Sequence, residues 1–164
     1  MTQRPALDLE LRARVEDFLI EEARLLDEGE LERWVSLFDD EAIYWVPCND
    51  SASDPRRHVS IIHDDRRRLD ERLLRMRSPM FWAQDPPSRT SRLVGNVQLQ
   101  AHSEGLEVSS RFILVELRRG CSTTFAGRYR HLLHDGGAAG FRILRKEAHL
   151  ISNDEPYYNL TFLF

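Results

Sequence analysis

The second half of this chain consists of strand-like segments separated by short turns. The segments are SRLVGNVQLQA, LEVSSRFILVEL, CSTTFAGRYRHLL and FRILRKEAHLI, and the connections between them are HSEG, RRG and HDGGAAG. Consecutive strands joined by short, turn-forming connections pair as antiparallel hairpins. The sequence therefore predicts a four-stranded antiparallel meander over residues 90–152. Its first segment alternates Leu93, Gly95, Val97 and Leu99 with polar residues, and a glycine within a strand, as at Gly95 or Gly127, often marks a bend or bulge.

The first half of the chain has helical periodicity instead. Helices are predicted within residues 8–38 and at 63–77, with a strand near 42–47 between them. Helices that precede a run of strands are typical of an α+β fold, in which the helices pack on one face of the sheet. A strongly curved sheet covered in this way forms a cone, whose interior is either a pocket or a filled core. A chain of 164 residues is long enough for one such domain, so we expect residues 1–164 to fold as a single unit.

Composition restricts the possible partners. The net charge of −4 argues against a nucleic-acid-binding protein. Lys146 is the only lysine, and the arginines that carry the remaining positive charge favour ion pairs in interfaces. Cys48 and Cys121 stand alone, without the spacing of a zinc site. No apolar run is long enough to cross a membrane and residues 1–12 are polar, so we expect a cytoplasmic protein.

The stretch SIIHDDRRRLDERLLRMR contains the triplet His63-Asp64-Asp65, which could belong to a metal site. Two histidines and a carboxylate can hold non-haem iron, and His58 would supply the second histidine. The same aspartates also suit a helix N-terminus, where a carboxylate caps the first turn. Asp64 also precedes Arg68 by four residues, the spacing of a helical ion pair. We therefore predict that the triplet begins a helix and binds no metal.

The interior of a cone could also hold an acid–base pair, because burial shifts the pKa values of its members. The candidates are Tyr129, His131, Glu147 and His149 on the strands, and Tyr44, His63 and Asp64 from the helical side. His131 shares strand parity with Phe125 and Tyr129, so these three side chains should point to one face. Each candidate is equally compatible with a core or rim position, and the sequence leaves this choice open.

The apolar tail EPYYNLTFLF at residues 155–164 has no charged side chain after Glu155. Such a segment must be buried, either within the chain or against a partner. Trp82, in a proline-rich connection, is a second aromatic anchor. Because aromatic residues and arginine dominate protein interfaces, the predicted interface residues are Trp82, Arg89, Arg92, Tyr157, Tyr158, Phe162 and Phe164.

Four segments resemble, in the same order, the small (beta) subunit of aromatic ring-hydroxylating dioxygenases, which are Rieske non-haem iron oxygenases. They are FLIEEARLLDEGELERWVSLFDDEAIYWVP, HDDRRRLDERLLRMR, WAQDPPSRTSRLVGNV and the closing NLTFLF. Together they extend over nearly the whole chain. The Pro-Pro-Ser-Arg-Thr-x-Arg-Leu stretch and the aromatic terminus make the resemblance fairly specific.

This resemblance implies a nuclear-transport-factor-2-like (cystatin-like) cone with N-terminal helices on a mainly antiparallel sheet. It also implies a non-catalytic structural subunit of a hetero-oligomeric oxidoreductase that takes part in aromatic hydrocarbon catabolism. The partner would be a large (alpha) subunit that carries the Rieske [2Fe–2S] cluster and the mononuclear iron, in an assembly of three large and three small chains. The small chains would form a trimer of their own. No catalytic residue, metal or cofactor is then expected in this chain, and neither nucleic acid nor membrane is expected as a partner.

Other functions share such a fold, because one cone can host several. The main alternative is a free-standing dehydratase or isomerase that uses a His/Asp pair in the pocket. A ligand-binding or simply dimeric cone protein is a third interpretation. The apolar tail and the segment around Trp82 favour the subunit.

Overall fold

The computed structural model describes residues 9–48, 59–78, 85–155 and 161–164. The helices are α1 (Leu9–Asp27), α2 (Leu31–Ser36) and α3 (Arg66–Arg77), with a short 3-10 helix η2 (Gly137–Ala139). The strands are β1 (Phe38–Pro47), β2 (Ser60–Asp65), β3 (Arg89–His102), β4 (Gly105–Arg118), β5 (Cys121–Asp135) and β6 (Phe141–Leu150).

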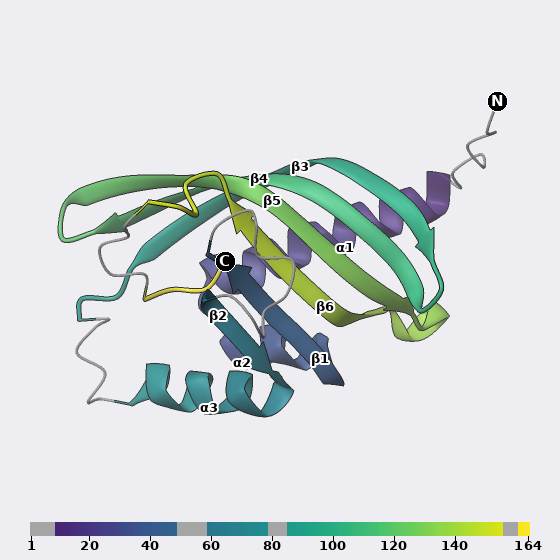
Figure 1. Ribbon diagram of the computed structural model, residues 1–164, viewed down its shortest axis with the longest axis horizontal. Coiled ribbons are helices and arrows are strands. Elements are labelled where there is room, and N and C mark those ends of the chain that lie inside the picture. The colour runs from purple at the N-terminus through teal and green to yellow at the C-terminus, as the bar shows by residue number, and fades with distance from the viewer. Residues whose placement is uncertain (1–8, 49–58, 79–84, 156–160) are drawn as a thin grey trace.

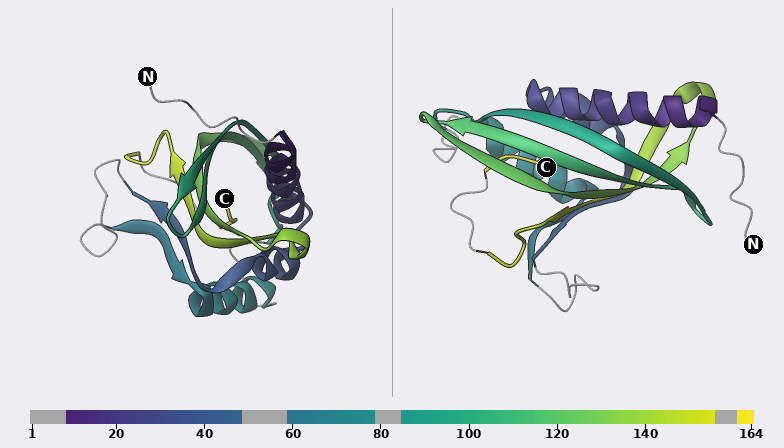
Figure 2. Two further views of the ribbon diagram at one scale, coloured as in Figure 1. Left: turned by 90° about the vertical axis from the view of Figure 1, so that its right-hand side faces the viewer. Right: turned by 90° about the horizontal axis from the view of Figure 1, so that it is seen from above.

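The strands form one sheet in the order β2-β1-β6-β5-β4-β3. Neighbouring strands are antiparallel except for β1 and β6, which run parallel. The predicted meander is therefore present as β3 to β6. The sheet is long and strongly curved (Figure 1), and seen end-on it curls around the C-terminal residues, with α1 beside the opening (Figure 2). The helices lie on the concave side of the sheet, which gives the predicted α+β cone.

The start of the third helix differs from the prediction. The triplet His63-Asp64-Asp65 lies at the end of β2, where it pairs with β1 in the register Trp45 to His63 and Tyr44 to Asp64. The helix begins only at Arg66, because the backbone of the triplet is already engaged in the sheet. A strand at residues 60–65 was not predicted.

The first strand of the meander contains a bulge at Gly95, as the glycine suggested. The register with β4 shifts between Gly95 and Gln98, and Asn96 has a positive φ of 53°. A bulge changes which residues face the core. Leu93 is therefore exposed, whereas Val97 and Leu99 pack against the core, so the simple alternation expected from the sequence is interrupted.

Aromatic side chains fill much of the cone. Trp34, Phe38 and Tyr44 contact one another edge to face, and Phe112 stacks on Tyr129 with ring centroids 4.1 Å apart. Edge-to-face and offset-stacked arrangements are favourable beyond the area that they bury.

Candidate functional site

The triplet that suggested a metal site does not converge on one point, because successive side chains of a strand point to opposite faces. The ring of His63 lies on the outer face, 6.5 Å from the ring of Trp45. Asp64 points inward and is buried. The two side chains therefore face different sides of the sheet.

The two aspartates of the triplet also have different roles. Asp65 is the N-cap of α3, and its Oδ1 accepts the backbone N–H of Arg68 at 2.8 Å. Asp64 accepts two hydrogen bonds from Arg72, at 2.5 and 3.1 Å. The cap agrees with the sequence analysis, but the predicted pairing of Asp64 with Arg68 is wrong. Because β2 continues to Asp65, Asp64 lies before the helix. Its carboxylate therefore pairs with Arg72, which is one helical turn beyond Arg68.

Metal ligands are not gathered in the described part of the chain. Among these residues, no group of three or more His, Cys, Asp or Glu side chains is placed to hold a metal ion. His58, the second histidine of the hypothesis, lies outside the described residues. Of the described helices, none combines the length and apolar character needed to cross a bilayer.

The interior of the cone holds a buried ionic cluster centred on Glu22 of α1. One carboxylate oxygen accepts a hydrogen bond from Lys146 Nζ at 2.6 Å and another from the indole N–H of Trp34 at 3.1 Å. The other oxygen lies 2.9 Å from His131 Nε2. All four residues are buried. The helix and the strands β5 and β6 are thus joined by one carboxylate.

Electrostatics keep this cluster charged. Burial alone would raise the pKa of Glu22, but the nearby ammonium of Lys146 and the imidazole of His131 lower it below its usual range. Burial lowers the pKa of Lys146, and the Glu22 carboxylate opposes that change. Lys146 Nζ also lies 4.7 Å from the ring centroid of Tyr129 and 5.4 Å from that of Trp34, where aromatic faces stabilise a cation.

The structure separates the acid–base candidates into two groups. Tyr129 and His131 point into the cone, as their parity predicted. Glu147 and His149 lie on the outer face, where His149 Nε2 is 2.7 Å from a Glu147 carboxylate oxygen. Arg145 also contacts Glu147, at 3.0 Å. A pair that combines candidates from both groups would have to act across the sheet.

Inside the cone the candidates form a core rather than a reactive pair. The side chain of His131 is fully buried and its Nε2 is bonded to Glu22. Burial raises the pKa of Tyr129 and the nearby Arg92 opposes that rise only in part, so the phenol is even further from ionisation at neutral pH than a free tyrosine. The hydroxyl of Tyr129 has no hydrogen-bond partner among the described residues. A general base must reach a proton on a substrate, whereas His131 and Glu22 are directed at each other.

Two members of this cluster, Glu22 and Lys146, were missed by the sequence analysis. Glu22 lies in α1 at helical spacing from the buried residues Val15, Leu19 and Leu26, so a carboxylate on the apolar stripe was the available signal. Lys146 is the only lysine of the chain and occurs in a strand of mostly buried residues. Two opposite charges at buried positions imply a pair, but the sequence does not show that they meet.

The described end of the apolar tail is buried within the chain. The rings of Phe162 and Phe164 lie 5.3 and 5.7 Å from the ring of Phe125. Arg92 donates to the carbonyl of Leu163 and pairs with Asp27. Of the two burial modes left open by the sequence, packing within the chain is thus present for residues 161–164.

The predicted interface residues are distributed unevenly. Arg89 is exposed, whereas Arg92, Phe162 and Phe164 are buried in the single chain. Trp82, Tyr157 and Tyr158 lie outside the described residues. The interface role of these seven residues stays a prediction.

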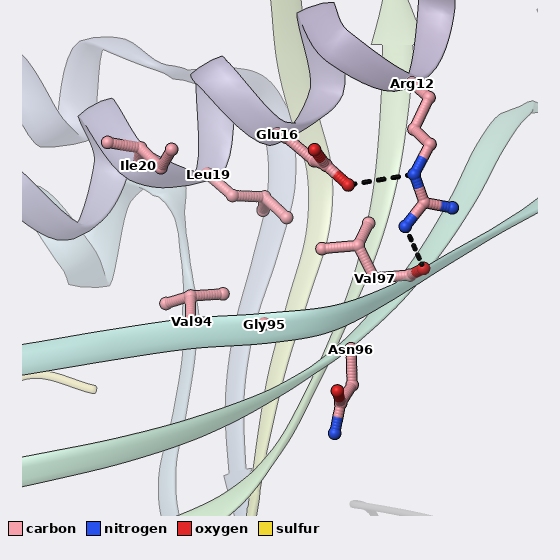
Figure 3. A pocket seen from close by; sticks show the side chains of 8 residues that line it. All are labelled: Arg12, Glu16, Leu19, Ile20, Val94, Gly95, Asn96 and Val97. Atoms are coloured by element: carbon pink, nitrogen blue, oxygen red, sulfur yellow. Dashed lines mark hydrogen bonds and ion pairs between the residues drawn. The ribbon is translucent and has the colours of Figure 1, made fainter. Parts of the chain in front are cut away.

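A cleft of about 240 Å³ lies on the side of the cone, between α1 and the bulge of β3 (Figure 3). It is lined by Arg12, Glu16, Leu19, Ile20, Val94, Gly95, Asn96 and Val97. Arg12 pairs with Glu16 at 2.9 Å and donates to the carbonyl of Val97 at 3.2 Å. The cleft is smaller than the ~300–1,000 Å³ typical of ligand pockets, and its charged groups are bonded to each other.

A comparison with models of protein families identifies the family of this chain. The family model described as the ring hydroxylating beta subunit matches residues 21–154. The chain belongs to this family. Two curated proteins are similar to this chain in sequence. The 2-halobenzoate 1,2-dioxygenase small subunit of Burkholderia cepacia is 39% identical over 100 residues, which are 58% of this chain and 60% of that protein. The small oxygenase component of the p-cumate 2,3-dioxygenase system of Pseudomonas putida is 36% identical over 147 residues, 85% of this chain and 78% of that protein.

Solved structures confirm the expected fold. The beta subunit of benzoate 1,2-dioxygenase from Burkholderia mallei superposes with a TM-score of 0.75 at 23% identity, covering 92% of this chain and 96% of that one. A nuclear-transport-factor-2-like protein with a cystatin-like fold from Novosphingobium aromaticivorans gives a TM-score of 0.60 at 14% identity, covering 87% and 83% of the two chains. The cone is therefore of the nuclear-transport-factor-2-like type.

Proposed function

We propose that this ring-hydroxylating beta subunit is a non-catalytic, structural component of a multicomponent aromatic ring-hydroxylating dioxygenase that takes part in aromatic-compound catabolism. The observation that carries the proposal is the cluster of buried, mutually bonded side chains inside the cone. Glu22 is bonded to three interior side chains, and Phe162 and Phe164 pack against Phe125 in the hydrophobic core. Because these interior groups are bonded to one another, we infer a structural rather than a catalytic role for this chain.

The cofactors of the oxygenase belong, in this proposal, to the large subunit. A Rieske cluster requires two cysteines and two histidines, and a mononuclear iron requires a converging set of histidines and a carboxylate. The described residues of this chain do not fit either group, because no suitable donors converge. We place the Rieske [2Fe–2S] cluster and the iron in the partner for this reason.

The assembly proposed for the cytoplasm contains three large and three small chains, with the small chains in contact as a trimer. Support for a large partner subunit comes from the relatives, which are named as a small subunit and a small oxygenase component. Both are named for aromatic carboxylates, 2-halobenzoate and p-cumate. Substituted benzoates are therefore the first substrates to test with the assembled enzyme.

The experiment compares the purified chain with the chain coexpressed with its large subunit and supplied with the electron-transfer proteins. We expect no turnover of benzoates by the chain alone and dihydroxylated product from the assembly. Product formed by the chain alone would contradict the proposal and favour a free-standing enzyme.

A variant of the interior separates these alternatives further. Tyr129→Phe removes a hydroxyl that has no partner among the described residues. We expect the assembled oxygenase to keep its turnover with this variant, since the phenol takes no part in the reaction. A large fall in kcat with normal assembly would instead indicate that the interior is catalytic.

A further inference from the structure

An apolar row of side chains crosses the outer face of the sheet. This face is on the side of the curved sheet away from the helices (Figures 1 and 2). Leu93 of β3, Ile113 of β4 and Ala126 of β5 are directly opposite one another in register. Ile151, just past the end of β6, continues the row by donating its backbone N–H to the Ala126 carbonyl at 3.0 Å. Leu93 and Ile151 are each 74% exposed and Ile113 is 49% exposed. Contiguous exposed apolar residues of this kind mark interaction surfaces.

The next row of the same face is basic. Arg111 of β4 lies directly opposite Arg128 of β5, and both are exposed. Like charges opposite each other in adjacent strands destabilise a sheet. Neither arginine forms an ion pair with a described residue. On its other side Arg128 is opposite His149 of β6, and the Glu147 carboxylate is hydrogen-bonded to that histidine. The fold thus keeps two adjacent, unneutralised guanidinium groups beside an apolar row.

We propose that this outer face, consisting of Leu93, Ile113, Ala126, Ile151, Arg111 and Arg128, is the docking surface for the large subunit. The inference rests on the proposed function. The chemistry of the face specifies its partner as an apolar strip flanked by Asp or Glu side chains. Arginine binds such carboxylates in bidentate geometry, and an apolar centre with a charged rim is the usual anatomy of an interface.

A second copy of this face is a poor partner for it. A two-fold contact would bring the Arg111 and Arg128 pair of one chain close to the same pair of the other. Four guanidinium groups without carboxylates would repel one another, and juxtaposed like charges disfavour association. The charge pattern therefore selects an acidic surface.

Arg111→Glu provides a test with two opposite readouts. In the isolated chain the new carboxylate faces Arg128, so repulsion is replaced by attraction and the melting temperature should rise. In the coexpressed oxygenase the same carboxylate faces the acidic partner surface. We expect the dissociation constant for the large subunit to increase by about tenfold or more, as for the loss of an interfacial charge pair. Leu93→Glu should weaken assembly similarly, without the rise in melting temperature.

Matched controls lie on α3. Leu74 is 69% exposed and Arg75 is also exposed, so Leu74→Glu and Arg75→Glu introduce the same changes away from the sheet. Assembly can be followed by mass photometry of the coexpressed oxygenase on dilution. Dissociation of the sheet variants with retention of the α3 variants supports the proposal. Sheet variants that assemble as tightly as the wild type overturn it.

Two further outcomes separate the docking surface from the proposed function. If the wild-type chain does not copurify with the large subunit, the proposed function fails, and the docking surface with it. If the wild-type chain assembles, but Arg111→Glu changes the sedimentation of the isolated small chain, the face binds a second copy and only the docking proposal is overturned.

Discussion

The phenol of Tyr44 is hydrogen-bonded in both directions to the backbone of Phe164. The Tyr44 hydroxyl donates to the Phe164 carbonyl at 3.2 Å and accepts the Phe164 N–H at 2.9 Å. Both residues are fully buried. This contact links β1 to a residue 120 positions later in the sequence. It fixes the described end of the apolar tail within the core.

Removal of that phenol oxygen should weaken the fold. In Tyr44→Phe the N–H and carbonyl of Phe164 remain buried and lose their partner, so we expect the free energy of unfolding to fall by about 1–3 kcal/mol. Urea denaturation monitored by circular dichroism measures this change. Tyr129→Phe is the matched control, because its hydroxyl has no described partner, and it should leave stability nearly unchanged. Equal effects of the two substitutions would contradict this assignment.

The Glu22–Lys146 pair should behave as one unit. Glu22→Gln leaves the ammonium of Lys146 buried without a counterion, and breaking a buried pair in this way costs about 3–5 kcal/mol. The double variant Glu22→Gln/Lys146→Met removes both charges and should be more stable than the two single effects predict. A double-mutant cycle in urea gives the coupling energy. Additive effects would show that the two charges do not stabilise each other.

The same cluster predicts a dependence of stability on pH. The pKa of Glu22 in the folded chain lies below its ordinary value of 4.5, so in acid the unfolded chain binds more protons. The contribution of Glu22 is complete above pH 4.5 and is lost as the pH falls toward the folded pKa. We therefore expect Glu22→Gln to flatten the acid side of the stability curve. Denaturation at a series of pH values tests this, and an unchanged slope would contradict it.

Lys146→Met provides a second test of the acid response. The substitution removes the ammonium that lowers the pKa of Glu22, so only His131 then opposes the effect of burial and the pKa should rise. The acid-induced loss of stability that arises from Glu22 should therefore diminish or reverse in sign. The wild-type acid response in this variant would argue against control by Lys146.

Gly127 is required for close packing rather than for a bulge. A Cβ at this position would lie 2.2 Å from the His149 carbonyl oxygen and 2.9 Å from the ring of Phe112. We expect Gly127→Ala to lower the free energy of unfolding by about 1–3 kcal/mol or more through overpacking. At Gly95 the same Cβ meets nothing within 4 Å, so Gly95→Ala should have a much smaller effect. Thermal denaturation of both variants provides the comparison, and equal losses of stability would refute it.

We expect the iron of the oxygenase to be bound by the large subunit and not by this chain. Because His63 and Asp64 point to opposite faces of β2, we expect less than stoichiometric iron in the isolated chain by elemental analysis. His63→Ala should leave the iron content of the assembled oxygenase unchanged, as should Asp65→Asn, which retains an oxygen that can cap α3. One iron per isolated chain, lost in His63→Ala, would contradict the structural role of the triplet.

Local patterns were sufficient for much of the fold. Strand alternation and turn composition predicted the meander β3 to β6, and helical periodicity predicted α1 and the body of α3. These features depend on contacts close in sequence or on burial of one face, which a single chain displays directly. The bulge at Gly95 was suggested by the glycine, but its effect on Leu93 was not, because the backbone geometry after a bulge is set by pairing with β4.

The sequence by itself determined the meander, α1 and the body of α3, and it carried the resemblance to the small dioxygenase subunits. It left a filled or a hollow cone as alternatives. Only the tertiary structure decided that Glu22 meets Lys146 and that Phe164 meets Tyr44 inside the cone, and that His63 and Asp64 face apart. The physical reason is distance along the chain. Glu22 and Lys146 are 124 positions apart, and neither carries a local pattern that names its partner. Such pairs exist only once the curved sheet has brought Lys146 of β6 within reach of the Glu22 side chain.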